Sequence, residues 1–129
     1  MSEEQRVRAA VTAWNTGVDE FVACLAPDVE LHPPAGFPDG DMWRGRDAVA
    51  AVLHDMFGSV FNSVTYEVED MERTPRGWLL HARESVEQQR GMKLEWTEWL
   101  LIELDGELIS RLQVFYDRDT ALKQSGLEV

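Results

Sequence analysis

The second half of the chain alternates apolar and polar residues with a period of two, and this pattern restricts the fold more than any other feature of the sequence. Four segments with this alternation occupy residues 64–69, 78–89, 93–104 and 108–116. Short turn sequences separate them at 74–77, 90–91 and 105–106. Long strands joined by tight turns predict a four-stranded antiparallel meander.

The first half has the spacing of helices instead. Apolar residues recur at helical intervals after Ser2, and a shorter apolar helix with Phe21, Val22 and Leu25 is expected to stop at Pro27. A short strand is predicted over 29–32, and a third helix over 46–57. Helices followed by strands predict an α+β fold in which the three N-terminal helices pack on one face of a curved sheet.

Three smaller segments complete the expected order of elements. Residues 35–45 are rich in Gly, Pro and Asp, which is typical of a loop, and Phe37 and Trp43 are its large apolar side chains. A last helical piece is predicted over 120–124, closed by Gly126.

Length and charge limit the classes of function. The 129 residues predict one domain, 1–129, with a single core. A net charge of −12 argues against binding to nucleic acid or to an anionic membrane surface, both of which require basic patches. The N-terminus lacks an apolar signal segment and Cys24 is the one cysteine, so we expect a cytoplasmic location.

Three strings resemble the NTF2-like superfamily and, within it, the SnoaL-like domain of the polyketide-cyclase type. They are FVACLAPDVELHPP (21–34), WRGRDAVAAVL (43–53) and DGELISRLQVFYDRDTALKQSGL (105–127). The resemblance implies a cone-shaped roll whose concave face, covered by the helices, encloses a pocket. It implies a cofactor-free isomerase, cyclase or dehydratase acting on an apolar, carbonyl-bearing ring compound. The alternative is a non-catalytic ligand-binding or dimeric accessory module, because one fold serves many functions.

The resemblance to ketosteroid isomerases suggests two catalytic residues. His32, just before Pro33, occupies the position of the general base, and an imidazole can take a proton near neutral pH. Glu98 matches the acid that stabilises an oxyanion, although Trp99 could occupy that position instead. Structural alternatives are a satisfied histidine at a strand end and a solvated glutamate. The tyrosine of those isomerases is replaced by Ala10.

A second resemblance, to limonene-type epoxide hydrolases, concerns Arg83. This residue fits the arginine of those enzymes, but Ser85 and Val114 stand where their acids would be, and SnoaL-type cyclases likewise have an acid where Val114 stands. Arg83 could orient an anionic ligand group or simply pair with a glutamate on a neighbouring strand. Asp117, near the end of the last strand, is expected to cap the final helix.

Aromatic residues could line the predicted pocket as a box for a small apolar or aromatic molecule. The candidates are Trp14, Trp43, Phe57, Trp99 and Tyr116, and core packing is the alternative reading of each. No spacing typical of a metal or nucleotide site is present, so no cofactor is expected. The outer face of the sheet mixes aromatic residues with Arg and Gln, which predicts a homodimer through that face.

Overall fold

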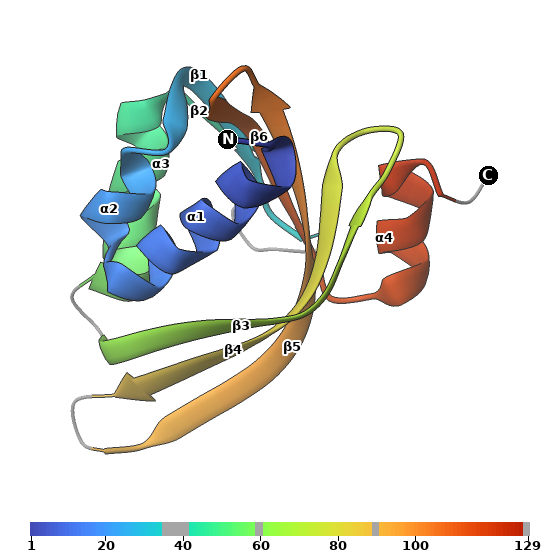
Figure 1. The fold of residues 1–129 in the computed structure, drawn as a ribbon. Helices are drawn as coiled ribbons and strands as arrows, with labels where there is room; N and C mark the ends of the chain where they lie inside the picture. The colour runs from blue at the N-terminus through green and yellow to red at the C-terminus, as the bar shows by residue number, and fades with distance from the viewer. Residues whose placement is uncertain (35–41, 59–60, 89–90, 128–129) are drawn as a thin grey trace.

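The computed structural model describes residues 1–34, 42–58, 61–88 and 91–127, which form one curved sheet with helices on both sides (Figure 1). The described helices are α1 (Glu3–Thr16), α2 (Val18–Val22), α3 (Arg46–Leu53) and α4 (Arg118–Ser125). The described strands are β1 (Leu25–His32), β2 (Trp43–Arg44), β3 (Phe61–Arg73), β4 (Trp78–Gln88), β5 (Lys93–Asp105) and β6 (Leu108–Phe115). The α+β class and the four-stranded meander are as predicted.

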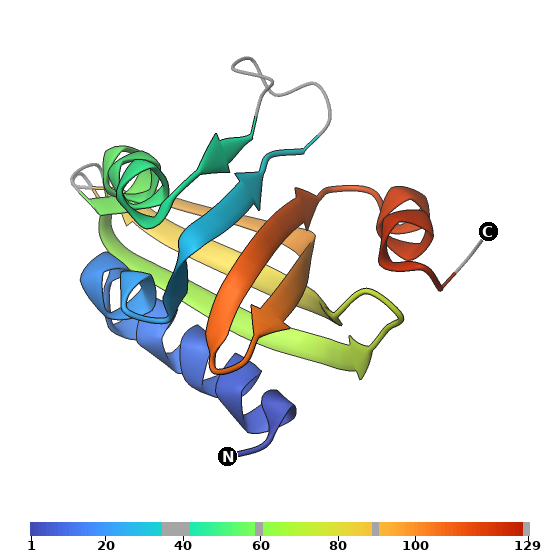
Figure 2. The ribbon, with the colours of Figure 1, turned by 90° about the horizontal axis from the view of Figure 1, so that it is seen from above.

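The strands are ordered β2-β1-β6-β5-β4-β3 in the sheet. All neighbours are antiparallel except β1 and β6, which pair in parallel. Figure 2 shows β1 beside β6, with α1–α3 and α4 on opposite sides of the sheet. The three N-terminal helices therefore cover the concave face, as expected, while α4 packs on the outer face.

The first helix begins where the sequence predicted. The Ser2 hydroxyl accepts a hydrogen bond from the backbone N–H of Gln5, and the Gln5 side chain accepts one from the Ser2 backbone, which forms a complete capping box. Val7 and Ala10 are buried on the face that meets the sheet. Capping fixes the start of α1, and the apolar stripe fixes its orientation.

The strand predicted over 29–32 is longer in the structure. It begins at Leu25, because Leu25 and Val29 are both buried in the core on either side of Pro27. The proline is accommodated where the pairing with β6 shifts register, between Leu25 and Glu30. The Arg46 guanidinium donates hydrogen bonds to the Leu25 carbonyl, which ties the start of α3 to this strand.

Two other boundaries differ from expectation. The helix predicted over 46–57 is α-helical to Leu53 and ends in a π-helical turn, His54–Gly58. Trp43 and Arg44, expected in a loop, form the two-residue strand β2 against β1. Residues 35–41 of the predicted loop, including Phe37, lie outside the described residues.

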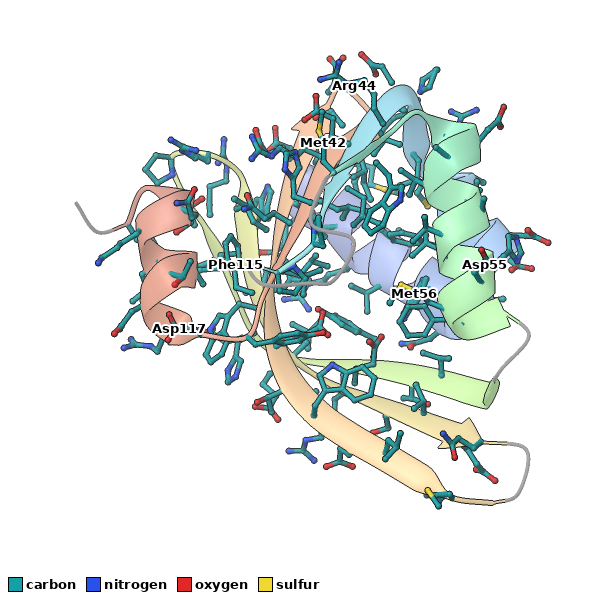
Figure 3. All side chains as sticks on the ribbon, turned by 180° about the vertical axis from the view of Figure 1, so that it is seen from behind. Met42, Arg44, Asp55, Met56, Phe115 and Asp117 are labelled. Atoms are coloured by element: carbon teal, nitrogen blue, oxygen red, sulfur yellow. The ribbon has the colours of Figure 1, made fainter. Side chains whose placement is uncertain are left out.

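Two apolar clusters form, one on each face of the sheet. The larger lies between the concave face and α1–α3 and includes Val7, Leu25, Val49 and Leu80. The smaller joins α4 to the outer face through the residues Leu79, Leu101, Phe115 and Ala121. Figure 3 shows Phe115 between the sheet and α4.

The capping residues of α4 are the predicted ones, although the helix, Arg118–Ser125, is longer than the predicted 120–124. The Asp117 carboxylate accepts a hydrogen bond from the Thr120 backbone N–H, so this residue is the predicted cap. Gly126 ends the helix in the left-handed conformation. None of the helices in the described part of the chain is long and apolar enough to span a bilayer.

Candidate functional site

The concave face and the helices enclose a cavity of about 470 Å³. Most of its wall is aliphatic or aromatic. The apolar residues of the wall include Ala10, Val11, Phe21, Leu31, Leu53, Met56, Leu100, Ile102, Leu112 and Val114. In Figure 3, Met56 points from the π-helical turn toward the concave face. A volume of this size suits a small organic molecule with one or more rings.

Glu84 is one of two carboxyl groups in this wall. It lies on β4 between Ala82 and Val86, which share its face and are buried, so the alternation of the strand turns Glu84 inward. The side chain is only 3% exposed, and Trp14 Nε1 donates a hydrogen bond to Glu84 Oε2 at 3.0 Å. Burial, and then the nearby charge of Glu98, raises the pKa of Glu84 to about 8, against the opposing effect of the Trp14 hydrogen bond.

Glu98 is the second carboxyl group, on the neighbouring strand β5. It is 6% exposed, and Trp96 Nε1 donates a hydrogen bond to Glu98 Oε1 at 2.8 Å. Burial raises the pKa of Glu98, while the Trp96 hydrogen bond and the approach of the Tyr66 hydroxyl oppose that rise. Hydrogen bonding therefore favours the charged form of Glu98 more than the charged form of Glu84.

The register of the sheet makes the two carboxyl groups diagonal neighbours. Ala82 is paired with Glu98, and Glu84 is paired with Trp96. Side chains in this relation lie close enough for their charges to interact. The charge of one group therefore affects the titration of the other, and Glu84, whose pKa is raised to about 8, keeps its proton at neutral pH.

Tyr66, on β3, adds a third polar group to the cavity wall. It is 6% exposed, and its hydroxyl oxygen is buried without a hydrogen bond of normal geometry. Burial, followed by the charges of Glu98 and Glu84, raises the pKa of Tyr66 well above its ordinary value. Tyr66 is therefore neutral, and its hydroxyl is available to a ligand.

Aromatic side chains surround these polar groups. The ring of Trp14 makes edge-to-face contacts with Phe21, at a centroid distance of 5.2 Å, and with Phe57, at 5.0 Å. These contacts hold the Trp14 indole in place for its hydrogen bond to Glu84. Tyr116 and Trp43 also line the cavity, and Tyr116 is largely exposed, at 59%, which places it at the opening.

Comparison with known proteins identifies the family to which this chain belongs. The profile of a SnoaL-like domain matches residues 7–111, most of the chain. The chain belongs to the SnoaL-like domain family. An uncharacterised protein of Mycobacterium tuberculosis is 30% identical over 111 residues, covering 85% of each chain.

Solved structures of NTF2-like proteins have the same fold as this SnoaL-like domain. An NTF2-like protein of unknown function from Burkholderia pseudomallei aligns with a TM-score of 0.75 at 17% identity, covering 97% of this chain and 98% of the other. A Mycobacterium tuberculosis protein in complex with estradiol-17beta-hemisuccinate aligns with a TM-score of 0.74 at 18% identity, covering 91% and 95%. The cone-shaped, NTF2-like fold expected from the sequence is confirmed.

Five of the predicted site residues of this SnoaL-like domain meet at the cavity. They are Glu98, Trp14, Trp43, Phe57 and Tyr116. The choice between Glu98 and Trp99 falls on Glu98, because Trp99 lies on the other face of β5 and stacks on His81 at 4.5 Å between ring centroids. Trp99 is therefore not placed to contact a ligand in the cavity.

His32 is not at the cavity. Leu31 lines it, so the alternation of β1 turns His32 to the outer face. There His32 Nε2 lies 2.9 Å from Glu30 Oε1, and Arg44 Nη2 donates a hydrogen bond to Glu30 Oε2 at 2.9 Å. The base predicted at His32 would have to reach a ligand through the sheet, which this geometry prevents.

Arg83 also lies on the outer face. Its Nη2 donates a hydrogen bond to Glu69 Oε1 at 2.8 Å, and its Nε lies 3.6 Å from Glu95 Oε1. This is the pairing with neighbouring glutamates that the sequence left open as the alternative to ligand binding. The placement of Arg83 does not support a direct contact with a ligand in the cavity.

The sequence did not predict Glu84, Tyr66 or Trp96 as site residues, although all three line the cavity. A signal for Glu84 was present, since the residues two positions away on each side, Ala82 and Val86, are apolar. A single glutamate in such a row indicates a carboxyl on the buried face. Tyr66 had no comparable signal, because a tyrosine in a strand usually packs in the core.

Proposed function

We propose that this domain binds an apolar, ring-bearing small molecule that carries a carbonyl group. The observation that carries the proposal is the pair of buried carboxyl groups, Glu84 and Glu98, in a wall that is otherwise apolar and aromatic. Glu84 in its acid form donates a hydrogen bond to the carbonyl oxygen of the ligand, while aromatic side chains contact its rings. The steroid derivative in the Mycobacterium tuberculosis neighbour is a ring-bearing ligand in the same fold and supports this class.

The second candidate function is proton transfer on the same ligand, as in an isomerase, cyclase or dehydratase. It is favoured by the different surroundings of the two groups: burial raises the pKa of Glu84 to about 8, whereas the rise in the pKa of Glu98 is opposed by the Trp96 hydrogen bond and the Tyr66 hydroxyl. Glu98 takes a proton from the carbon next to the carbonyl, and Glu84 donates a hydrogen bond to the oxygen on which negative charge develops. Where the ligand has a double bond between its β- and γ-carbons, removal of the proton gives a dienolate, and return of the proton from Glu98 to the γ-carbon completes an isomerisation.

Binding is tested by titration of the tryptophan fluorescence with β-tetralone, a bicyclic ketone. Trp14 and Trp96 line the cavity, so we expect saturable quenching in the wild type. Affinity should fall about tenfold in Glu84→Leu, because leucine fits the apolar wall but cannot donate a hydrogen bond to the ligand. The control Glu72→Leu, on the exposed side of β3, should bind like the wild type. No saturation in the wild type would refute binding of this ligand class.

Catalysis is tested separately by exchange of the protons next to the carbonyl of β-tetralone in deuterated water, followed by NMR. We expect the rate above background to be lost in Glu98→Gln and retained in His32→Ala, because His32 lies on the other face of β1. If the wild type binds β-tetralone but does not exchange its protons, the domain is a ligand-binding module and the second candidate function is refuted. Equal exchange in the wild type and in Glu98→Gln would remove Glu98 as the base.

We also propose that the outer face of the sheet forms a homodimer. Outside the area covered by α4, this face carries the stacked rings of His81 and Trp99. It also carries Arg111 beside Glu103, and Arg111 Nε and Glu103 Oε2 are buried without hydrogen bonds. Light scattering at about 100 μM should report twice the mass of the chain. A monomer at that concentration would contradict the proposal.

A further inference from the structure

The described wall of the cavity holds two buried carboxyl groups and no positively charged side chain beside them. The titratable groups in its described wall are Glu84, Glu98, Tyr66 and Tyr116, and none of the wall residues is Lys, Arg or His. Glu84 and Glu98 come from β4 and β5, and Tyr66 comes from β3. The elements that close the cavity from the other side, α1, α2, α3, β1 and β2, add no charged residue to that wall.

A buried carboxylate without a cationic partner is costly, because removal of a charge from water must be repaid by an opposite charge or by hydrogen bonds. Glu98 receives one complete hydrogen bond, from Trp96 Nε1. Glu84 receives one, from Trp14 Nε1. Among the described residues, the wall supplies no counter-charge for an ionised Glu98, and a bound cation would supply one.

The remaining hydrogen-bonding capacity of the wall is mainly for accepting. The indole N–H donors of Trp14 and Trp96 are already used by the carboxyl groups. The Tyr66 hydroxyl is buried without a hydrogen bond of normal geometry and lies in the wall beside Glu98. Carboxylate and hydroxyl oxygens in the wall of one cavity suit a group that has N–H donors and a positive charge.

The rings around the carboxyl groups favour the same kind of group. Trp14, Trp43, Trp96, Phe57 and Tyr116 line the cavity together with Tyr66. The faces of aromatic rings attract organic cations, and the attraction is stronger where water is excluded. An aromatic wall with carboxyl groups at one end combines two features that recognise an alkylammonium group.

We propose that this cavity also binds protonated amines that carry an apolar, ring-bearing body, and binds them more tightly than neutral molecules of the same shape. The ammonium group lies against Glu98 and donates hydrogen bonds to its carboxylate and to the Tyr66 oxygen. Where the amine is bound, the cation favours loss of the proton from Glu84, which becomes a second carboxylate partner. This goes beyond the proposed binding of carbonyl compounds and does not depend on it.

A matched series of three bicyclic molecules tests the proposal by calorimetry on the intact protein. The series is β-aminotetralin, which is cationic near neutral pH, β-tetralone, which is neutral, and tetralin-β-carboxylate, which is anionic. We expect the amine to bind about tenfold or more tightly than the ketone at pH 7, and the carboxylate not to bind. Equal or weaker binding of the amine relative to the ketone would overturn the inference while leaving the proposed function intact. Binding of the amine but not of the ketone would support the inference and overturn the proposed binding of carbonyl compounds.

The dependence on pH gives a second, independent measurement. Between pH 6 and pH 9 the amine should bind more tightly as Glu84 loses its proton, because simple alkylamines remain protonated up to about pH 10. The ketone should bind more weakly over the same interval, because its hydrogen-bond donor is lost. Glu98→Gln, which keeps the shape of the side chain, should remove the preference for the amine. Parallel pH profiles for the two ligands, or an unchanged preference in Glu98→Gln, would refute an ion pair at this site.

Discussion

Replacement of Glu84 by glutamine should stabilise the protein at high pH and have little effect at low pH. Glutamine keeps the shape of the side chain and can accept the Trp14 hydrogen bond, but it cannot ionise. The fold accepts Glu84 as a neutral acid, because burial raises its pKa to about 8 from an ordinary value of 4.5. The folded state therefore binds this proton more tightly than the unfolded state does.

The sign of the pH effect follows from this difference. Below pH 4.5 both states hold the proton, and Glu84 has no electrostatic cost. As the pH rises from 4.5 to about 8, the unfolded chain ionises first, so the free energy of unfolding falls. At about 1.4 kcal/mol for each pKa unit, the loss approaches roughly 5 kcal/mol above pH 8. Glu84→Gln avoids this loss.

Urea unfolding followed by tryptophan fluorescence measures the effect at pH 5, 7 and 9. We expect the free energies of unfolding of Glu84→Gln and wild type to agree within about 1 kcal/mol at pH 5 and to differ by several kcal/mol at pH 9. The control Glu72→Gln, at an exposed position of β3, should show no such divergence. A constant difference between Glu84→Gln and wild type at all three pH values would refute the argument, as would a variant less stable than wild type at pH 9.

Three further substitutions test other parts of the structure. Asp117→Ala removes the hydrogen bond that caps α4 and should lower the free energy of unfolding by about 1 kcal/mol, whereas Asp117→Asn should retain most of it. Leu101→Ala, at a buried position of the contact between β5 and α4, should cost about 2–5 kcal/mol in urea unfolding, and the exposed Leu94→Ala much less. His32→Ala should leave the affinity for β-tetralone unchanged, and a tenfold loss would show that His32 reaches the cavity despite its place on the outer face of β1.

The local pattern of the sequence predicted much of the fold. Periodicity and turn residues gave the four long strands, because each strand has one buried face and each turn has residues that suit it. The strand β2 was missed because two residues, Trp43 and Arg44, are too few to show a period. The start of β1 was placed too late because Pro27 usually ends an element, whereas here a register shift accommodates it.

The candidate site was less predictable, because alternation says which residues share a face but not which face becomes concave. That choice depends on where the helices pack and on how the strands curve. It decides that Glu98 rather than Trp99 lines the cavity, and it moves His32 and Arg83 to the outside. The partnership of Glu84 with Trp14 spans 70 positions, and no local pattern could indicate it.

Strand β5 supports two different structures with alternate residues. Trp96, Glu98, Leu100 and Ile102 line the cavity, whereas Trp99 and Leu101 pack with the cluster beneath α4. Substitutions at one set can therefore change ligand preference without disturbing the packing of the other. For protein engineering, Trp96 and Glu98 are therefore the positions of β5 to randomise in a library, while the buried Ile102 and the outer positions are held constant to keep the scaffold stable.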